Sequence, residues 1–135
     1  MRFELIDQVL ERQSDRIRAL KNVSVAEEYL ADHFPGFAVL PGVMMLETLV
    51  QAGRHLLESE GQPGPWILAE ARNVRYGNMV RPGQALVVEV TIKSRDEHSV
   101  DMIGVGMVGD QVAVQARLKL APVPASRTAA VAQNA

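Results

Sequence analysis

A histidine and a glutamate flank a loop rich in proline and glycine, and these residue types could together carry out acid–base chemistry. The loop from His33 to Gly42 reads His-Phe-Pro-Gly-Phe-Ala-Val-Leu-Pro-Gly and contains two Pro-Gly pairs. Proline fixes its own φ, while glycine permits a sharp turn or a close backbone approach. Pro41 stands before an apolar run, where a helix tolerates proline best. We therefore expect a helix to begin here, with Glu47 about one turn into it.

The start of this expected helix offers hydrogen-bond donors. The first backbone N–H groups of a helix have no partner within it, and they lie at the positive end of the helix dipole. In this chain they belong to Gly42 and Val43. Unpaired donors, the imidazole of His33 and the carboxyl of Glu47 together predict an acid–base site.

The composition is that of one ordinary globular domain. The chain has 135 residues, of which 47% are hydrophobic and 22% charged, and its net charge is −2. This charge gives no field that would attract nucleic acid. The absence of cysteine excludes disulfides, thiolate nucleophiles and cysteine-ligated zinc. The longest near-apolar run begins at Val43 and is broken by Glu47, so we expect no membrane span and a cytoplasmic location.

The elements that must position the site are a long helix and several strands. The helix is expected over about 42–58; it is apolar almost all round as far as Gly53, which predicts burial on every side. A short amphipathic helix is expected over 3–10 and one helical turn over 26–30. About five strands are indicated by β-branched or alternating residues, over 17–25, 66–76, 86–93, 100–108 and 112–120.

Strands clustered after one buried helix indicate the α+β class. A single antiparallel sheet curled around the helix would cover much of it. We expect one domain over residues 1–121. Residues 122–135 are rich in Ala, Pro, Ser and Thr and are expected to form a flexible tail.

The motif residues resemble the 3-hydroxyacyl-[acyl-carrier-protein] dehydratase family. The similarity is carried by His33-Phe34-Pro35-Gly36, Leu40-Pro41-Gly42-Val43, Glu47 and Gln51-Ala52-Gly53, and it extends to Leu5–Leu10, Ala19–Val23 and the Arg81-Pro82-Gly83-Gln84 turn. The resemblance implies a hotdog fold, a curved antiparallel sheet wrapped around a central helix. It also implies a homodimer, which in this family is often assembled into a trimer of dimers.

The resemblance further implies a reaction and a role for each residue. The reaction is reversible loss of water from a (3R)-hydroxyacyl thioester carried on acyl carrier protein by phosphopantetheine, which yields the trans-2-enoyl thioester without a metal or cofactor. His33 would remove the proton at C2, and Glu47 would help protonate the departing 3-hydroxyl. The Gly42 N–H would bind the thioester carbonyl, and the Val39 carbonyl would orient His33. In this family the histidine and the carboxyl of one site come from different subunits.

The chemistry calls for these residue types. Charge grows on the thioester oxygen as the C2 proton leaves, and fixed N–H donors at a helix start suit that oxyanion. Histidine titrates near neutrality and suits the base. A carboxyl among apolar side chains is pushed towards its neutral form, which can donate a proton.

Other interpretations of these residues remain open. Glu47 could form a structural ion pair with Arg54 or Arg72. Gln51, one turn further on, could hold the carboxyl in place or satisfy buried backbone. Asp32, His33 and Glu47 match no zinc spacing, so no metal is expected.

One pair of residues departs from the family pattern. Family members have His-Pro, or in one branch Asp-Pro, where this chain has Phe37-Ala38. Phe37 would favour apolar or aromatic acyl chains if it points into the acyl tunnel, and would be simple packing if it points into the core. Two competing functions are a hotdog acyl-CoA thioesterase, which would use water as the nucleophile, and a non-catalytic acyl-binding hotdog protein.

Overall fold

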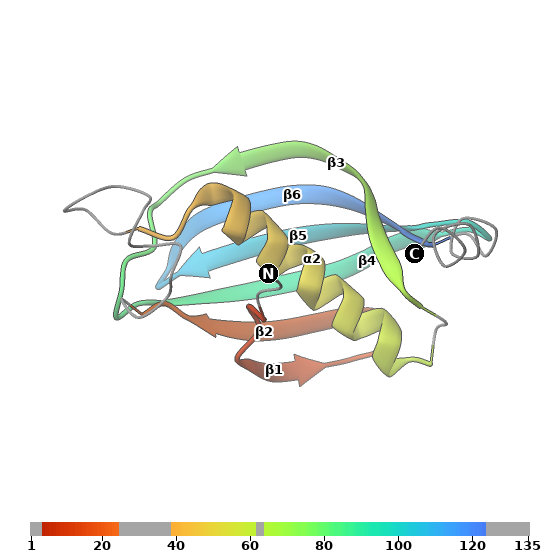
Figure 1. The fold of residues 1–135 in the computed structure, drawn as a ribbon, viewed down its shortest axis with the longest axis horizontal. Coiled ribbons are helices and arrows are strands. Elements are labelled where there is room, and N and C mark those ends of the chain that lie inside the picture. Colours follow the sequence, from red (N-terminus) through yellow and green to blue (C-terminus); the bar gives the residue numbers. More distant parts are fainter. Residues whose placement is uncertain (1–3, 25–38, 62–63, 124–135) are drawn as a thin grey trace, which may run out of the picture.

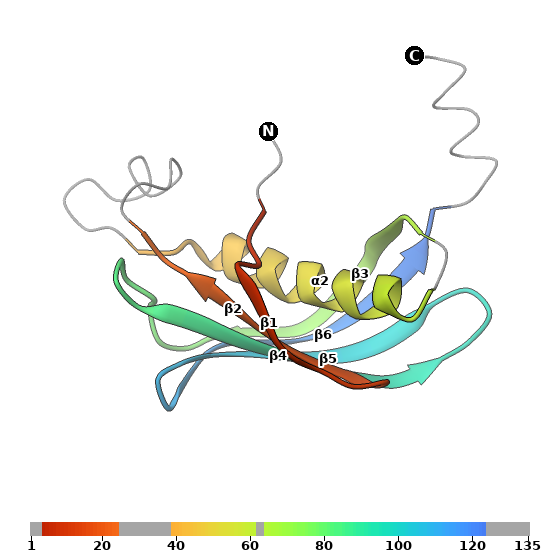
Figure 2. The same cartoon turned by 90° about the horizontal axis from the view of Figure 1, so that it is seen from below.

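The computed structural model describes residues 4–24, 39–61 and 64–123, and within them one long helix lies across one curved sheet. The sheet is antiparallel throughout, with the strand order β1-β2-β4-β5-β6-β3. Figures 1 and 2 show the helix on the concave side of the sheet. The elements are β1 (Gln8–Arg12), β2 (Arg16–Asn22), α2 (Gly42–Ser59), β3 (Trp66–Tyr76), β4 (Ala85–Arg95), β5 (Val100–Val108) and β6 (Gln111–Pro122).

The long helix begins and ends where the sequence predicts. Pro41 is its N-cap residue, with the extended backbone that proline favours, and the helix ends at Ser59 before Gly61, whose φ is +77°. Its residues Leu49, Leu56 and Leu57 are fully buried. The helix therefore contributes one apolar face to a core that it shares with the inner face of the sheet.

The inner face of the sheet is made by alternating side chains. In β4 the residues Leu86, Val88 and Val90 are buried, as the alternation of this segment predicts. In β5 the inward positions include Gly104, and a Cβ atom there would lie 3.1 Å from Leu49 of α2. The absence of a side chain at Gly104 therefore allows the helix to approach the centre of the sheet closely.

The prediction for the N-terminal segment is wrong. Residues 3–10 were expected to form an amphipathic helix, whereas Gln8–Arg12 is the edge strand β1, which makes six strands instead of about five. Leu5 is buried in a non-helical stretch before that strand, and the Asp7 N–H donates to Leu20 of β2. A segment this short is a marginal helix by itself, and pairing with β2 supplies its backbone hydrogen bonds instead.

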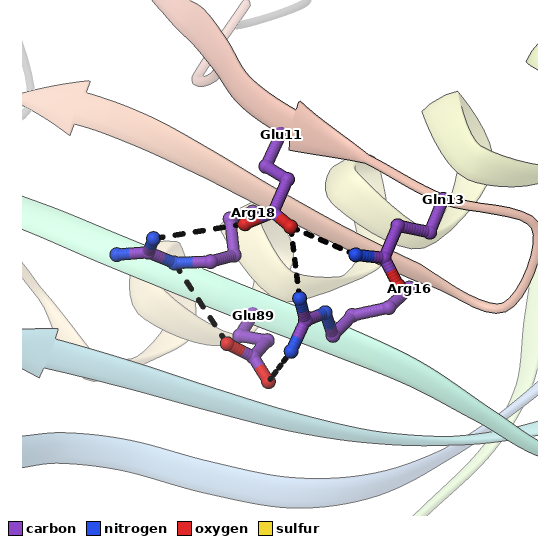
Figure 3. Close-up of polar contacts among 5 residues, drawn as sticks. All are labelled: Glu11, Gln13, Arg16, Arg18 and Glu89. Atoms are coloured by element: carbon purple, nitrogen blue, oxygen red, sulfur yellow. Dashed lines mark hydrogen bonds and ion pairs between the residues drawn. The ribbon is translucent and has the colours of Figure 1, made fainter.

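An ion-pair network joins the outer surfaces of β1, β2 and β4 (Figure 3). Glu11 accepts from Arg16 at 2.9 Å and from Gln13 at 2.9 Å, and it lies 3.9 Å from Arg18. Glu89 lies within 3.8 Å of both arginines. Two carboxylates thus alternate with two guanidinium groups across three strands, which helps to fix the edge strand to the sheet.

Candidate active site

The residues predicted for the site divide into two groups. His33 and Phe37 lie outside the described residues. The expected helical turn over 26–30 and residues 124–135 of the expected tail also lie outside them. Val39, Gly42, Val43, Glu47 and Gln51 are described, and all lie on α2 or immediately before it. The structure therefore places the helical half of the predicted site.

The start of α2 leaves two backbone donors open. The N–H groups of Met44 and Met45 both donate to the Pro41 carbonyl, at 3.0 and 3.1 Å. Within the described residues, the N–H groups of Gly42 and Val43 have no acceptor. Because they also lie at the positive end of the helix dipole, they can bind a carbonyl oxygen that gains negative charge.

An aromatic ring that was not predicted for the site lies close to this helix start. A Cβ atom at Gly42 would lie 3.0 Å from the ring of Tyr76, the last residue of β3. Glycine at this position therefore lets the ring lie close to the Gly42 Cα atom. No local pattern in the sequence indicates this contact, because it depends on where β3 ends relative to α2.

Glu47 is held by two side chains of its own helix. Its Oε1 accepts from Gln51 Nε2 at 3.4 Å and from Arg54 Nη1 at 3.4 Å. Both predicted alternatives for Gln51 are found: its Nε2 contacts the carboxyl, and its Oε1 accepts from the backbone N–H of buried Leu5 at 2.9 Å. Of the two arginines suggested as ion-pair partners, Arg54 is the one in contact, whereas Arg72 pairs with Glu70 at 3.3 Å.

The surroundings of Glu47 differ from the apolar environment that was expected. Its side chain is 40% exposed in the single chain, and that of Arg54 is 27% exposed. An ion pair this exposed contributes up to about 1 kcal/mol to stability. The contact is therefore more important for where it holds the carboxylate than for the stability of the fold.

An open groove of about 570 Å³ runs along α2, and Glu4 and Leu68 of β3 also line it. Val43, Met44 and Leu46 line one part of it, and Gln51 and Arg54 line another, with Glu47 between them. Val43 is 68% exposed in the single chain. The prediction that α2 is buried on every side is therefore wrong for one copy, because one sheet covers only one side of a helix.

Two further observations bear on the kind of site. No cluster of three or more His, Asp or Glu side chains suited to a metal ion occurs among the described residues. In residues 4–24, 39–61 and 64–123, no helix has the length and hydropathy needed to cross a membrane.

Comparisons with known proteins find relatives of this chain. A family model described as a FabA-like domain matches residues 1–117. The chain is 38% identical to 3-hydroxyacyl-[acyl-carrier-protein] dehydratase FabZ of Thermotoga petrophila over 120 residues, which cover 87% of this chain and 85% of the relative. It is 34% identical to the protein of the same name from Syntrophobacter fumaroxidans, over 93% of this chain and 87% of the relative.

Solved structures share the fold at low identity. The dehydratase heterocomplex ApeI:P from Xenorhabdus doucetiae matches with a TM-score of 0.75 and 20% identity, over 95% of this chain and 88% of that one. Thioesterase superfamily member 2 from Mus musculus matches with a TM-score of 0.65 and 11% identity, over 83% and 78%. The α+β hotdog fold expected from the resemblance is confirmed.

Proposed function

This chain belongs to the FabA-like family, and we propose from this premise that it is a 3-hydroxyacyl-[acyl-carrier-protein] dehydratase. It removes water from a (3R)-hydroxyacyl thioester and leaves the trans-2-enoyl thioester, in the synthesis of fatty acids or related lipids and polyenes. The two relatives of 34–38% identity, which this chain matches over most of their length, carry this name. The substrate is presented by acyl carrier protein through a phosphopantetheine arm.

One observation about the site supports this function above others. The N–H groups of Gly42 and Val43, which have no acceptor among the described residues, lie about one helical turn from Glu47, and Val43 lines the same groove as that carboxyl. A thioester carbonyl bound at the helix start therefore has its C2 and C3 atoms directed along the groove towards the carboxyl. This order of groups suits elimination across the C2–C3 bond.

The proposed mechanism moves two protons. His33, oriented by the Val39 carbonyl, takes the C2 proton while the Gly42 N–H stabilises the charge on the thioester oxygen. Glu47 gives its proton to the 3-hydroxyl, which leaves as water as the C3–O bond breaks. Val43 and Gln51 help to bind the substrate, and Phe37 contacts the acyl chain and adapts the site to apolar or aromatic chains.

We propose that the complete site needs a second copy of the chain. The groove along α2 exposes Val43, Met44 and Leu46, and a second copy would cover these apolar side chains. In the composite site, His33 of one protomer faces Glu47 of its partner. Three such dimers can assemble further into a hexamer.

The direct test measures elimination with each proposed group removed. We expect His33→Ala and Glu47→Gln each to lower the rate of dehydration by ~10²–10⁴-fold, because each removes a general acid or base. Purified protein is given 3-hydroxybutyryl and crotonyl thioesters, and enoyl absorbance is followed in both directions. Circular dichroism of each variant checks that the fold is intact.

The same assay separates the competing functions. A thioesterase would release free thiol from the 3-hydroxybutyryl thioester, which a thiol reagent detects, without any rise in enoyl absorbance. A non-catalytic acyl-binding protein would change neither signal. Near-normal turnover by either variant would show that the role given to that residue is wrong.

A further inference from the structure

The guanidinium of Arg54 connects two elements of the site. Its Nε donates to the carbonyl of Trp66 at 2.9 Å, and its Nη1 contacts Glu47 Oε1 at 3.4 Å. Trp66 is the first residue of β3, which begins near the C-terminal half of α2 (Figure 1). One side chain thus spans from the backbone of a strand to the proposed acid.

The shape of the guanidinium makes this connection directional. The group is planar, and its N–H donors have a fixed relative geometry. Because the short Nε bond to Trp66 fixes the plane, it also fixes where Nη1 points. The position of β3 therefore determines where Arg54 holds the Glu47 oxygen, and a lysine, whose ammonium has no planar fork, would not impose this geometry.

Gln51 supplies a second support to the same oxygen. The Leu5 N–H, which can only donate, contacts Gln51 Oε1 at 2.9 Å and so leaves the Gln51 amide nitrogen for Glu47. The contacts of Gln51 and Arg54 both end on Oε1. In the described part of the chain neither support uses Oε2, and Glu47 lines the groove.

We propose that Arg54 is a positioning residue for the dehydration, acting through Glu47 from an anchor on the Trp66 carbonyl. The inference rests on the proposed function. Arg54 holds Oε1 so that Oε2 can deliver the proton to the departing 3-hydroxyl. After that transfer Glu47 is a carboxylate, and its contact with the charged Arg54 becomes an ion pair and is stronger. The contacts of 3.4 Å are long, and such bonds commonly tighten once substrate binds.

The test compares variants of Arg54 in two backgrounds. In the otherwise native chain we expect Arg54→Met to lower kcat about 10- to 100-fold with little change in KM, since a misplaced catalytic group costs rate rather than binding. Arg54→Lys keeps the charge but not the planar geometry, so its kcat should lie between those of the native protein and Arg54→Met. In the Glu47→Gln background, Arg54→Met should cause no further loss, because the group through which it acts is already gone.

A matched control removes another arginine that contacts the same helix. Arg95 of β4 lies 3.4 Å from Glu60, the C-cap residue of α2, and the contact is exposed. Arg95→Met should leave kcat unchanged. Equal losses of kcat for Arg54→Met in both backgrounds, a change in KM alone, or an equal effect of Arg95→Met would overturn the proposal.

A crystal structure of Arg54→Met tests the positioning of Glu47 without a measurement of turnover. We expect the Glu47 carboxyl to change rotamer while α2 and the start of β3 stay in place. If the native protein lacks dehydratase activity, the proposed function fails, and a displaced carboxyl would then support only the positioning contact. An unmoved Glu47 would refute the positioning role whatever the activity. If Arg54→Met does not fold, Arg54→Lys serves for both measurements.

Discussion

Glu47 has one carboxylate oxygen engaged by its own helix, and the residues responsible lie four and seven positions further along. This spacing places Gln51 and Arg54 on the same face of α2 as Glu47. Gln51 also contacts Leu5, 46 residues away in sequence, and Arg54 also contacts Trp66, 12 residues away. The helix therefore determines which side chains meet Glu47, and the backbone of Leu5 and of Trp66 determines where those side chains are held.

A separate carboxylate in the turn between β4 and β5 provides a pH prediction at the residue scale. Asp96 Oδ1 accepts from the N–H groups of His98 at 2.7 Å and Ser99 at 2.9 Å. These bonds, that from His98 first, hold the pKa of Asp96 below its ordinary value of 3.8. A pKa that is lower in the folded state means that the carboxylate stabilises the turn at higher pH and loses this effect as pH falls through the folded value.

We therefore expect the Asp96 carboxyl to titrate below pH 3.8 in an NMR experiment on the native protein. The amide signals of His98 and Ser99 should move with the same midpoint, because their N–H groups are the donors. In Asp96→Asn that shared transition should disappear, since the amide oxygen does not ionise. A midpoint at or above 3.8 in the native protein would contradict the prediction.

At the scale of elements, the packing of α2 on the sheet depends on Gly104 of β5. A Cβ atom at this position would meet three atoms of the Leu49 side chain within 3.4 Å. Leu49 is fully buried and lies on the sheet side of the helix. The close approach of helix and sheet in turn places the opposite side of α2, which carries Glu47, at the groove.

A size exchange tests this contact. We expect Gly104→Val to lower the free energy of unfolding by ~1–3 kcal/mol through overpacking, and Leu49→Ala to lower it by ~2–5 kcal/mol through a cavity. Combined, they should cost less than the sum by ~0.5–3 kcal/mol, because valine fills space that leucine leaves. Urea denaturation measures all three. Gly104→Val with Leu56→Ala is the matched control and should be additive; additivity of both pairs would show that Gly104 does not contact Leu49.

The sequence predicted the helices and strands whose ends are marked by nearby residues. The strand Trp66–Tyr76 and the helix from Gly42 agree with the sequence, because alternation, proline and glycine mark their ends. Val112 does not follow the predicted alternation: a register shift pairs Gly106 with Val114 and Met107 with Val112, and Val112 is exposed. A bulge of this kind arises between strands, so neither strand's own pattern reveals it.

For the site, the sequence predicted the donors and the acid but not their surroundings. Gly42 and Glu47 lie as their spacing along one helix requires. The anchoring of Arg54 on Trp66 and the contact of Tyr76 with Gly42 depend on how β3 crosses α2. Those contacts are set by the tertiary packing of separate segments, which periodicity within one segment does not contain.

At the scale of the whole molecule, α2 has one covered side and one open side. The covered side contributes Leu49, Leu56 and Leu57 to the core, whereas Val43 on the other side is mostly exposed. A groove of this size, lined in part by the apolar side chains of Val43, Met44 and Leu46 and lying next to the helix start, is suited to a ligand and to a second chain together. The composite dimer proposed above uses it for both.

Subunit mixing tests whether the two proposed catalytic groups of one site come from two chains. His33→Ala and Glu47→Gln proteins, each inactive, are mixed in equal amounts under conditions that exchange subunits. Half of the dimers are then hybrids, and each hybrid has one site with both native groups and one with neither, so about a quarter of native activity should return. Dimers made entirely hybrid by two different affinity tags should reach about half. The control mixes two separately tagged batches of His33→Ala, which should recover nothing. If native mass spectrometry proves exchange and the hybrids stay inactive, His33 and Glu47 of one site belong to the same chain, and the groove along α2 must be closed by a dimer that shares no catalytic group.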